Sequence, residues 1–464
     1  MSELWRRTAG ELAAMIRSGD VSSREVVQAH LDRIEEVNPI VNAVTVPLID
    51  SALEAADAAD AASGDERGAL HGVPFSIKEN IDCVGSPTTN GVPAFANTLP
   101  ERDAAIVTRM KAAGGIPLAR TNLPEMGSRL DTDNPLRGRT RNPWNGNRTP
   151  GGSSGGDAAA LATGMTPFGL GNDIGGSLRN PAYCCGIASL KPTVGRVPLS
   201  SVNAGEYGGM ANALLTDGPM TRSVADLRLG LSIMAGRDRR DPQSVDAPLT
   251  GPVPDRPRAA LVTKIPGCEL PAATVSEIER AGRVLAAQGW DVEEAEPPEL
   301  DKVNDIWGKV ITYDSDVTFA EMKAVVRPVV YDYLVEMDAR FDARSVSNAV
   351  MHGERQRLRA AWSEWLTEYT VCVGPTWTCV PWQIDSDLDP DTGMDLLLDT
   401  IRFITPGNVL GIPGVALPTG VADGLATGIQ VYAELYREDL CLLAAEAIEA
   451  ESPMPTPIDP LPWE

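Results

Sequence analysis

Two serine residues, each preceded by glycine, are the residues of this sequence best suited to nucleophilic chemistry. Ser153 lies in PGGSSGG (residues 150–156), directly before an alanine-rich stretch that we expect to be helical. Ser177 follows in GNDIGGSLRNPA (residues 171–182). Two consecutive glycines before a serine can turn neighbouring backbone amides toward one point, which is the geometry that an oxyanion needs. The pattern therefore indicates Ser177 as a candidate nucleophile.

A nucleophilic serine needs a base, and the three histidines are poor candidates for that role. His30, His71 and His352 are far apart, and none has an acidic companion in the arrangement of a triad. Lys78 follows an apolar strand pattern in GVPFSIKEN (residues 72–80) instead of lying in a polar loop. Burial could lower its pKa from about 10.4 toward 7 to 8, at a cost of roughly 4 kcal/mol. Together with the two serine segments, this placement predicts Lys78 as the base.

The glycines around Ser153 also permit a different interpretation, a loop that binds phosphate at the start of a helix. A phosphate loop normally continues with Gly-Lys-Ser or Gly-Lys-Thr. This segment has neither that sequence nor a neighbouring basic residue. Acyl transfer is therefore the favoured interpretation.

The cysteines and histidines give no indication of a metal site. Seven cysteines form an odd set, and none is spaced as C-x-x-C. This pattern is typical of reduced thiols in a cytoplasmic protein. We expect neither a metal nor a cofactor.

Charge and hydropathy argue against several classes of partner. The 464 residues include 40 Lys and Arg and 64 Asp and Glu, a net charge of −24. So acidic a surface repels phosphate backbones and anionic lipid, which argues against nucleic acid and membrane as partners. Glu11 interrupts the amino-terminal apolar run, and the charge-free stretch 403–422 holds three prolines and four glycines. We therefore expect no signal peptide, no transmembrane helix and a cytoplasmic location.

Short apolar runs alternate with helical patterns along the chain, as in α/β proteins. Ser22 and Glu25 form a capping box for a long helix that we expect to stop at Asn38 and Pro39, and Asp103 is expected to cap another helix. We expect strands at residues 116–119, 167–170, 259–262, 370–373, 414–417 and 428–432. We expect helices at residues 224–234, 275–287 and 440–448.

Two segments have an open role. Residues 237–256 are composed like a linker, and they are either a domain boundary or a long surface loop. Residues 300–370 place aromatic residues among charges at helical spacing, which indicates either a helical layer with an aromatic core or a cap that borders a substrate pocket. These aromatic residues are Trp307, Tyr331, Tyr333, Trp362 and Trp365.

Three motifs taken together resemble the amidase signature family of serine hydrolases. GVPFSIKEN, PGGSSGG and GNDIGGSLRNPA occur in the order and at the intervals of that family, and further similarity runs through nearly the whole chain. The resemblance implies an α/β fold, with a large twisted mixed β-sheet covered on both faces by α-helices in three layers. It also implies one domain over residues 1–464 with its catalytic core at residues 60–235, although the chain length alone suggests about three domains.

The resemblance implies a role for each reacting group. Ser177 would be the nucleophile, Lys78 the base, and Ser153 the residue that relays the proton between them, held in this family with a cis peptide bond. Water would then hydrolyse the acyl-enzyme through the reverse relay. The backbone amides expected to bind the oxyanion are those of Ile174, Gly175, Gly176 and Ser177.

Further residues match positions close to the reacting groups. Ser154, Asp173 and Arg179 would orient the serine loop and pair with one another or with the backbone. Three departures from the family pattern put substrate fit in question but leave the reacting groups in place. They are Asn172, where threonine is common, Asp157, where serine is common, and Ala426, where proline is common.

The family hydrolyses amides that range from free carboxamides to anilides and fatty amides, and some members hydrolyse carbamates. We predict an amidase for small neutral amides or carbamates, because the candidate pocket segments are apolar and poor in basic residues. Those segments are residues 126–133, 201–214 and 377–382, which could instead be surface loops, and the pocket residues expected in them are Met126, Tyr207 and Trp377. Within the family, the sequence is similar to the urethane-cleaving amidases recovered from environmental DNA.

Two other classes of function remain open. The glutaminase subunit of a tRNA-dependent amidotransferase shares all three motifs, but it works with partner subunits that hold the tRNA. A non-catalytic binding protein could have kept the same fold. The sequence is compatible with a monomer or a homodimer.

Overall fold

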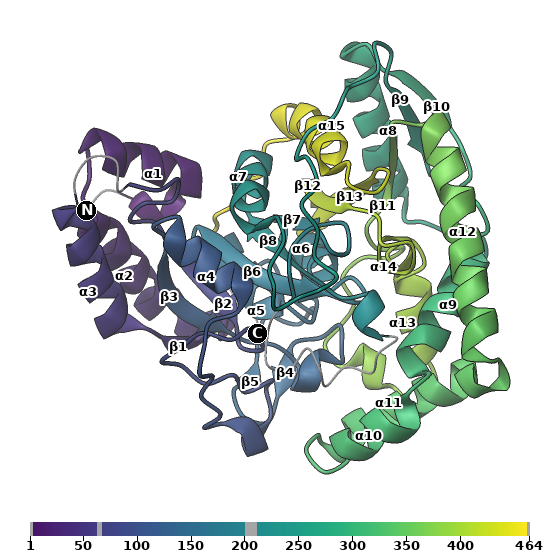
Figure 1. Cartoon of the computed structure of the whole chain (residues 1–464), viewed down its shortest axis with the longest axis horizontal. Helices are drawn as coiled ribbons and strands as arrows, with labels where there is room; N and C mark the ends of the chain where they lie inside the picture. The colour runs from purple at the N-terminus through teal and green to yellow at the C-terminus, as the bar shows by residue number, and fades with distance from the viewer. Residues whose placement is uncertain (1–2, 63–66, 200–210, 462–464) are drawn as a thin grey trace.

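A mixed sheet of eleven strands forms the centre of the molecule (Figure 1). The structure is a computed structural model, and it describes residues 3–62, 67–199 and 211–461. In this part of the chain the strand order is β1-β3-β2-β6-β8-β7-β12-β13-β11-β9-β10. The strands are β1 (Val44–Pro47), β2 (Pro74–Lys78), β3 (Ile116–Thr121), β6 (Phe168–Asp173), β7 (Ala188–Lys191), β8 (Thr216–Thr221), β9 (Arg258–Leu261), β10 (Asp291–Glu294), β11 (Val371–Pro375), β12 (Gly414–Ala422) and β13 (Leu425–Tyr432). A separate two-stranded ribbon pairs β4 (Asp133–Asn134) with β5 (Gly138–Arg139).

Helices cover both faces of this sheet. On one face lie α1 (Ala9–Ser18), α4 (Ala105–Ala112), α7 (Val224–Met234), α8 (Ala272–Ala287) and α15 (Glu438–Ala450). On the other lie α2 (Ser23–Val41), α3 (Ile49–Ala61), α5 (Gly155–Ala162), α6 (Arg179–Cys185), α9 (Leu300–Thr312), α12 (Asn348–Glu368), α13 (Gly393–Thr400) and α14 (Thr405–Val409). Helices α10 (Ser315–Met322) and α11 (Pro328–Phe341) pack against each other, and α11 packs against α9. The predicted α/β fold, with helices on both faces of a large mixed sheet, is confirmed.

The strands are buried on both sides, as the alternation of side chains in β11 shows. Val371 and Val373 pack into the core beneath α8 and α15, whereas Cys372 between them packs into the core beneath α9 and α12. Successive side chains of a strand point to opposite faces, so a strand between two helical layers is apolar throughout. Because its strands are buried on both faces, the sheet is a rigid support for the polar residues at the strand ends.

Most of the predicted elements are present, and two local predictions were wrong. Helix α2 does not stop at Pro39 but continues to Val41, where Asn42 closes it in the left-handed conformation (φ 53°). The capping box of Ser22 and Glu25 is present. Asp103 does not cap α4: Ala104 is the N-cap residue, and the Asp103 carboxylate instead accepts a hydrogen bond from the Val84 amide and pairs with Lys111.

The central strands β7 and β8 were not predicted from the sequence. The β7 sequence, ASLK, is only four residues long, and the β8 sequence, TDGPMT, contains glycine and proline and shows no apolar alternation, yet every residue in both strands is buried. Strands in the middle of a sheet covered on both faces lack the alternation that marks a half-exposed strand. Tertiary contacts, not local pattern, therefore place these two strands.

Residues 300–370 fold into the helices α9 to α12, which lie together at one side of the molecule, in green in Figure 1. Trp307, Tyr333 and Trp362 are buried in the core that these helices form. In the described part of the chain, no helix is long and apolar enough to cross a membrane.

Candidate active site

Lys78 is the last residue of β2 and is fully buried between β3 and β6. Its Nζ lies 2.7 Å from Oγ of Ser153, which belongs to the loop before α5. The same Nζ lies 2.7 Å from Oδ1 of Asn172, a residue of the neighbouring strand β6. Parallel pairing of β2 with β6 brings the carboxyl ends of both strands to one edge. The sheet therefore sets the lysine directly against a serine.

The environment of Lys78 favours its neutral form. Burial lowers the pKa of this lysine to about 7, while the nearby carboxylates Asp157, Asp173 and Asp217 act in the opposite direction. Burial also raises the pKa of Asp157 to about 6 and that of Asp217 to about 7. A lysine with such a pKa is about half neutral at pH 7, and the neutral form is the one that can act as a general base.

The loops that carry the two serines contact one another directly. The Ser154 amide donates a hydrogen bond to the Ser177 carbonyl at 3.3 Å. Asn180 Nδ2 donates to the carbonyl oxygens of Gly152 (3.4 Å) and Gly175 (3.0 Å), one in each loop. The peptide bond between Gly152 and Ser153 is cis, as the family resemblance implied. Asn180 is thus a bridge between the two serine-bearing segments.

Trp377 supports this bridge and does not line a substrate pocket. Its side chain is fully buried, and its Nε1 donates to Oδ1 of Asn180 at 2.8 Å. The expectation of a pocket wall at Trp377 is therefore wrong, because the ring packs between Tyr183 and Trp382 in the core.

Asp173 and Arg179 form a buried ion pair that shapes the Ser177 loop. The guanidinium Nε lies 3.0 Å from Asp173 Oδ2, and Nη2 lies 3.1 Å from Oδ1. Burial alone would raise the pKa of the Asp173 carboxyl, but Arg179 outweighs it and holds the pKa at about 2. The carboxylate also accepts hydrogen bonds from the backbone amides of Gly176 (2.7 Å) and Leu178 (3.3 Å).

This bonding narrows the set of amides that can receive an oxyanion. The amide of Gly176 is already bonded to Asp173, so the expected set is reduced to Ile174, Gly175 and Ser177. Gly176 has a φ of 93°, and a Cβ at this position would lie 2.5 Å from Asn180 Oδ1. Glycine is therefore required here for the turn and not as a donor.

An apolar cavity of about 300 Å³ reaches Ser177. That volume is at the lower end of the range for small-molecule sites. Trp307 of α9 lies against Gly175, where a Cβ would be 2.8 Å from the indole ring, and its Nε1 donates to the Ile174 carbonyl at 3.1 Å. Met126, predicted as a pocket residue, lines this cavity. Tyr207, the third predicted pocket residue, lies outside the described residues.

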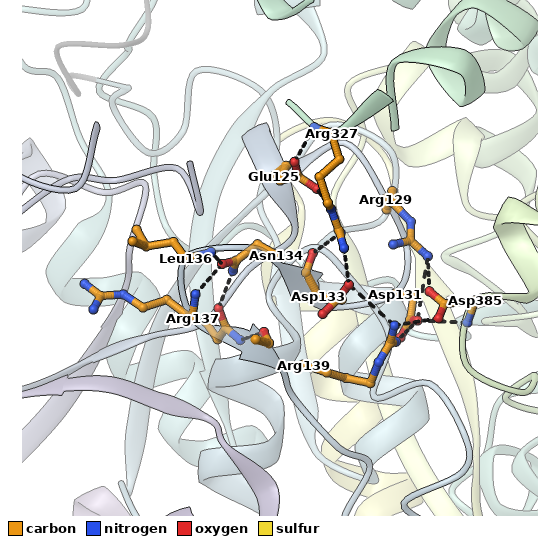
Figure 2. Close-up of polar contacts among 12 residues, drawn as sticks. Glu125, Arg129, Asp131, Asp133, Asn134, Leu136, Arg137, Arg139, Arg327 and Asp385 are labelled. Carbon is orange, nitrogen blue, oxygen red and sulfur yellow. Dashed lines mark hydrogen bonds and ion pairs between the residues drawn. The ribbon is translucent and has the colours of Figure 1, made fainter. Parts of the chain in front are cut away.

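Two residues that line the cavity each have a buried polar side-chain atom without a hydrogen-bond partner among the described residues. These atoms are Oδ1 of Asn90 and Nη1 of Arg129. The remaining nitrogens of Arg129 are bound to Asp385 and Asp387 (Figure 2 draws the pair with Asp385).

Several of these residues were not recognised from the sequence. In the sequence Asn172 stands out only as a departure from the family pattern, Arg129 lies within the candidate wall segment 126–133, and nothing local marks Asn180 or Asn90. Ser154 was expected to orient the loop, and its backbone does so, but its buried Oγ has no hydrogen-bond partner in the described structure. Among the described residues, no group of three or more His, Cys, Asp or Glu side chains could hold a metal ion.

Comparison with known proteins agrees with this geometry. The amidase family model matches residues 25–442. The indoleacetamide hydrolase of Bradyrhizobium diazoefficiens is 41% identical over 96% of this chain and 86% of its own length. A glutamyl-tRNA(Gln) amidotransferase subunit of Acidothermus cellulolyticus is 33% identical over 97% of this chain and 95% of its own length. Among solved structures, 6-aminohexanoate cyclic dimer hydrolase is similar with a TM-score of 0.85 and 28% identity, covering 97% of this chain and 98% of that chain. The resemblance seen in the sequence is thereby confirmed, and the chain belongs to the amidase family.

Proposed function

We propose that this protein hydrolyses neutral amides with an apolar, partly aromatic acyl group through an acyl-enzyme on Ser177. Membership of the family makes the chain a hydrolase of amide C–N bonds. The proposal of an acyl-enzyme on Ser177 and of an apolar acyl group rests on the contact between Lys78 Nζ and Ser153 Oγ, next to an apolar cavity that reaches Ser177. Similarity to an indoleacetamide hydrolase supports arylacetamides as the substrate class.

In this mechanism neutral Lys78 takes a proton from the Ser153 hydroxyl, which in turn takes the proton of Ser177. Ser177 Oγ attacks the amide carbon, and the free amides among residues 174–177 stabilise the negative oxygen. The relay then returns the proton to the nitrogen as the C–N bond breaks and the amine leaves. Water attacks the acyl-enzyme through the same relay and releases the carboxylic acid.

Carbamates are a second substrate class within this proposal. A carbamate presents the same carbonyl to the same hydroxyl, and its acyl product loses carbon dioxide after release. The similarity to urethane-cleaving amidases stays a prediction, to be tested with an aryl carbamate beside the amides.

The glutaminase function is the second candidate, and the similarity to a glutamyl-tRNA(Gln) amidotransferase component favours it. Free glutamine carries an ammonium and a carboxylate, each of which needs an opposite charge in a buried site. The Arg129 guanidinium on the cavity wall is already paired with Asp385 and Asp387. The cavity therefore lacks a free cation for the glutamine carboxylate among the described residues, and it fits a neutral amide better.

A substrate panel tests the choice between these candidates. We expect the purified chain alone to hydrolyse indoleacetamide or phenylacetamide with a kcat/KM at least about 100-fold above that for glutamine, because an unpaired charge in this cavity costs several kcal/mol. Ammonia release measures both reactions on the same scale. Hydrolysis of glutamine at a comparable rate, with arylacetamides left intact, would favour the amidotransferase function.

A substitution next to Lys78 tests how the base is tuned. Asp217 lies opposite Asn172 in the β6–β8 pairing, and its negative charge raises the pKa of Lys78. Replacing Asp217 with Asn removes this charge, so the acid limb of the pH–rate profile should move to lower pH by up to about one unit. The exposed Asp395→Asn change is the matched control and should leave the profile in place. A shift of the limb to higher pH would contradict this description of the base.

A further inference from the structure

Arg327 connects the helical segment of residues 300–370 to the turn beside the serines. It precedes α11 directly, at the junction with α10. Its backbone amide and Nε donate to the two carboxylate oxygens of Glu125 at 2.7 Å and 2.6 Å. Its Nη1 donates to Asp133 Oδ2 at 2.8 Å. Figure 2 shows the guanidinium lying between these two carboxylates.

Glu125 belongs to the part of the chain that borders the reacting groups. Its side chain is fully buried, whereas that of Arg327 is one-third exposed. The next two residues, Met126 and Gly127, line the cavity. A Cβ on Gly127 would lie 3.3 Å from Ser153 Oγ, so this turn packs against the proposed relay. Arg327 therefore holds the same short turn that forms one side of the cavity next to Ser153.

The two helices on either side of Arg327 contribute apolar side chains to the cavity lining, beside the polar residues Asp314, Thr318 and Glu321. Phe319 and Met322 of α10 precede the junction, and Tyr333, Leu334 and Met337 of α11 follow it. All five lie on the cavity wall. The ion pair is thus placed where it fixes the distance between the apolar wall and the serine-side turn.

We propose that Arg327 is a positioning residue that makes the site selective for bulky apolar acyl groups, by holding the wall formed by α10 and α11 against the Glu125–Gly127 turn. This inference rests on the proposed amidase function and extends it. A bulky acyl group gains its affinity from packing on the wall, whereas an acetyl group occupies only the space at Ser177. A loosened wall should therefore weaken the binding of bulky substrates more than that of small ones, because packing against mobile side chains contributes less to affinity.

The test compares phenylacetamide with acetamide as substrates. Arg327→Met removes the ion pair but leaves the buried Glu125 carboxylate without its cation, which can also destabilise the fold. The double variant Glu125→Gln with Arg327→Met removes both charges and so avoids an unpaired buried charge. Arg340→Ala is the matched control, because Arg340 lies on α11 and forms an exposed ion pair with Asp395 of α13.

We expect both Arg327 variants to raise KM for phenylacetamide at least about tenfold, with kcat/KM for acetamide changed by less than about threefold. The double variant should recover the melting temperature of the wild type without recovering this KM, and Arg340→Ala should change neither. An unchanged ratio between the two substrates in the folded double variant would overturn the proposal. An equal loss for both substrates would also overturn it, because it would indicate damage to the reacting groups.

A binding measurement separates this inference from the proposed function. In a Ser177→Ala background no hydrolysis occurs, so calorimetry with phenylacetamide measures the dissociation constant, which depends on packing against the wall. Arg327→Met and the double variant should each weaken this binding at least about tenfold, which supports the inference whether or not the wild type turns the amide over. Equal binding in all three proteins would overturn the inference while leaving the amidase function intact.

Discussion

Replacing Ser177 with alanine is expected to abolish amide hydrolysis and covalent labelling by a fluorophosphonate. Ser177 lines the apolar cavity, and its loop is held by the Asp173–Arg179 pair and by Asn180. Without the nucleophile no acyl-enzyme forms, so kcat should fall by about 10⁴-fold or more. Rates of ammonia release and mass spectrometry of the labelled protein measure the two effects.

The matched control for this change is Ser189→Ala. Ser189 is also a buried serine, its Oγ has no hydrogen-bond partner in the described structure, and it lies on β7 outside the site. Its loss should leave both activity and labelling intact. Labelling that persists in Ser177→Ala would point to another nucleophile. Wild-type protein that neither labels nor turns over any amide would favour a binding protein on the same fold.

Replacing Lys78 with methionine is the second change with a large expected effect. Methionine keeps the apolar stem but has no amine to receive the proton from Ser153 Oγ, which lies 2.7 Å from Nζ in the wild type. General-base catalysis contributes about 10²- to 10⁴-fold, and the relay depends on it, so kcat should fall by about 10³-fold or more. Steady-state kinetics at pH 8 measure this loss.

The wild-type pH profile tests the same group without a mutation. The pKa of Lys78 is about 7, and the neutral amine is the active form, so the rate should rise with pH through 7 and level off above it. At pH 5 the rate should be about 100-fold below the plateau. Asp157 and Asp217 titrate in the same window, so the apparent pKa belongs to the cluster as a whole. A flat profile from pH 5 to 9 would contradict a lysine base.

The Lys78→Met protein should remain folded, which separates loss of chemistry from loss of structure. The folded pKa of about 7 lies below the ordinary 10.5, so the folded state binds fewer protons than the unfolded chain between these values. Stability therefore rises with pH across this window, and below pH 7 the buried lysine costs about 5 kcal/mol. Methionine removes that cost, but Ser153 and Asn172 each lose the hydrogen bond from the Lys78 amine, which lowers stability by about 1 to 3 kcal/mol per bond. These effects nearly cancel, and thermal unfolding checks the balance.

The interpretation of the chain as one domain with its catalytic core at residues 60–235 stays a prediction. The sheet is consistent with it, because the carboxyl-terminal strands β12 and β13 pair into the same sheet as β2 and β6. Cytoplasmic location and the choice between monomer and homodimer are likewise predictions that need separate measurements.

The identity of the reacting residues was readable from the sequence because the features that mark them are local. The glycines before Ser177 act through their own backbone angles. Lys78 is recognised from the apolar residues directly before it, which form the strand β2. The helix boundary signals at Ser22 and Glu25 are local in the same way. Such signals survive in a single sequence, since no distant segment is needed to interpret them.

Other properties came only from the tertiary structure. Lys78 is about half neutral at pH 7 because strands and loops from distant parts of the sequence exclude water from its amine, and Asn172 reaches it only through the pairing of β2 with β6. Trp377 was assigned to the pocket by its type, yet packing turns it toward Asn180. Arg327 and Glu125 are 202 residues apart, and no local pattern connects them. Desolvation and long-range pairing depend on which distant segments meet, so the sequence determined which groups can react, and the fold decided their protonation and their neighbours.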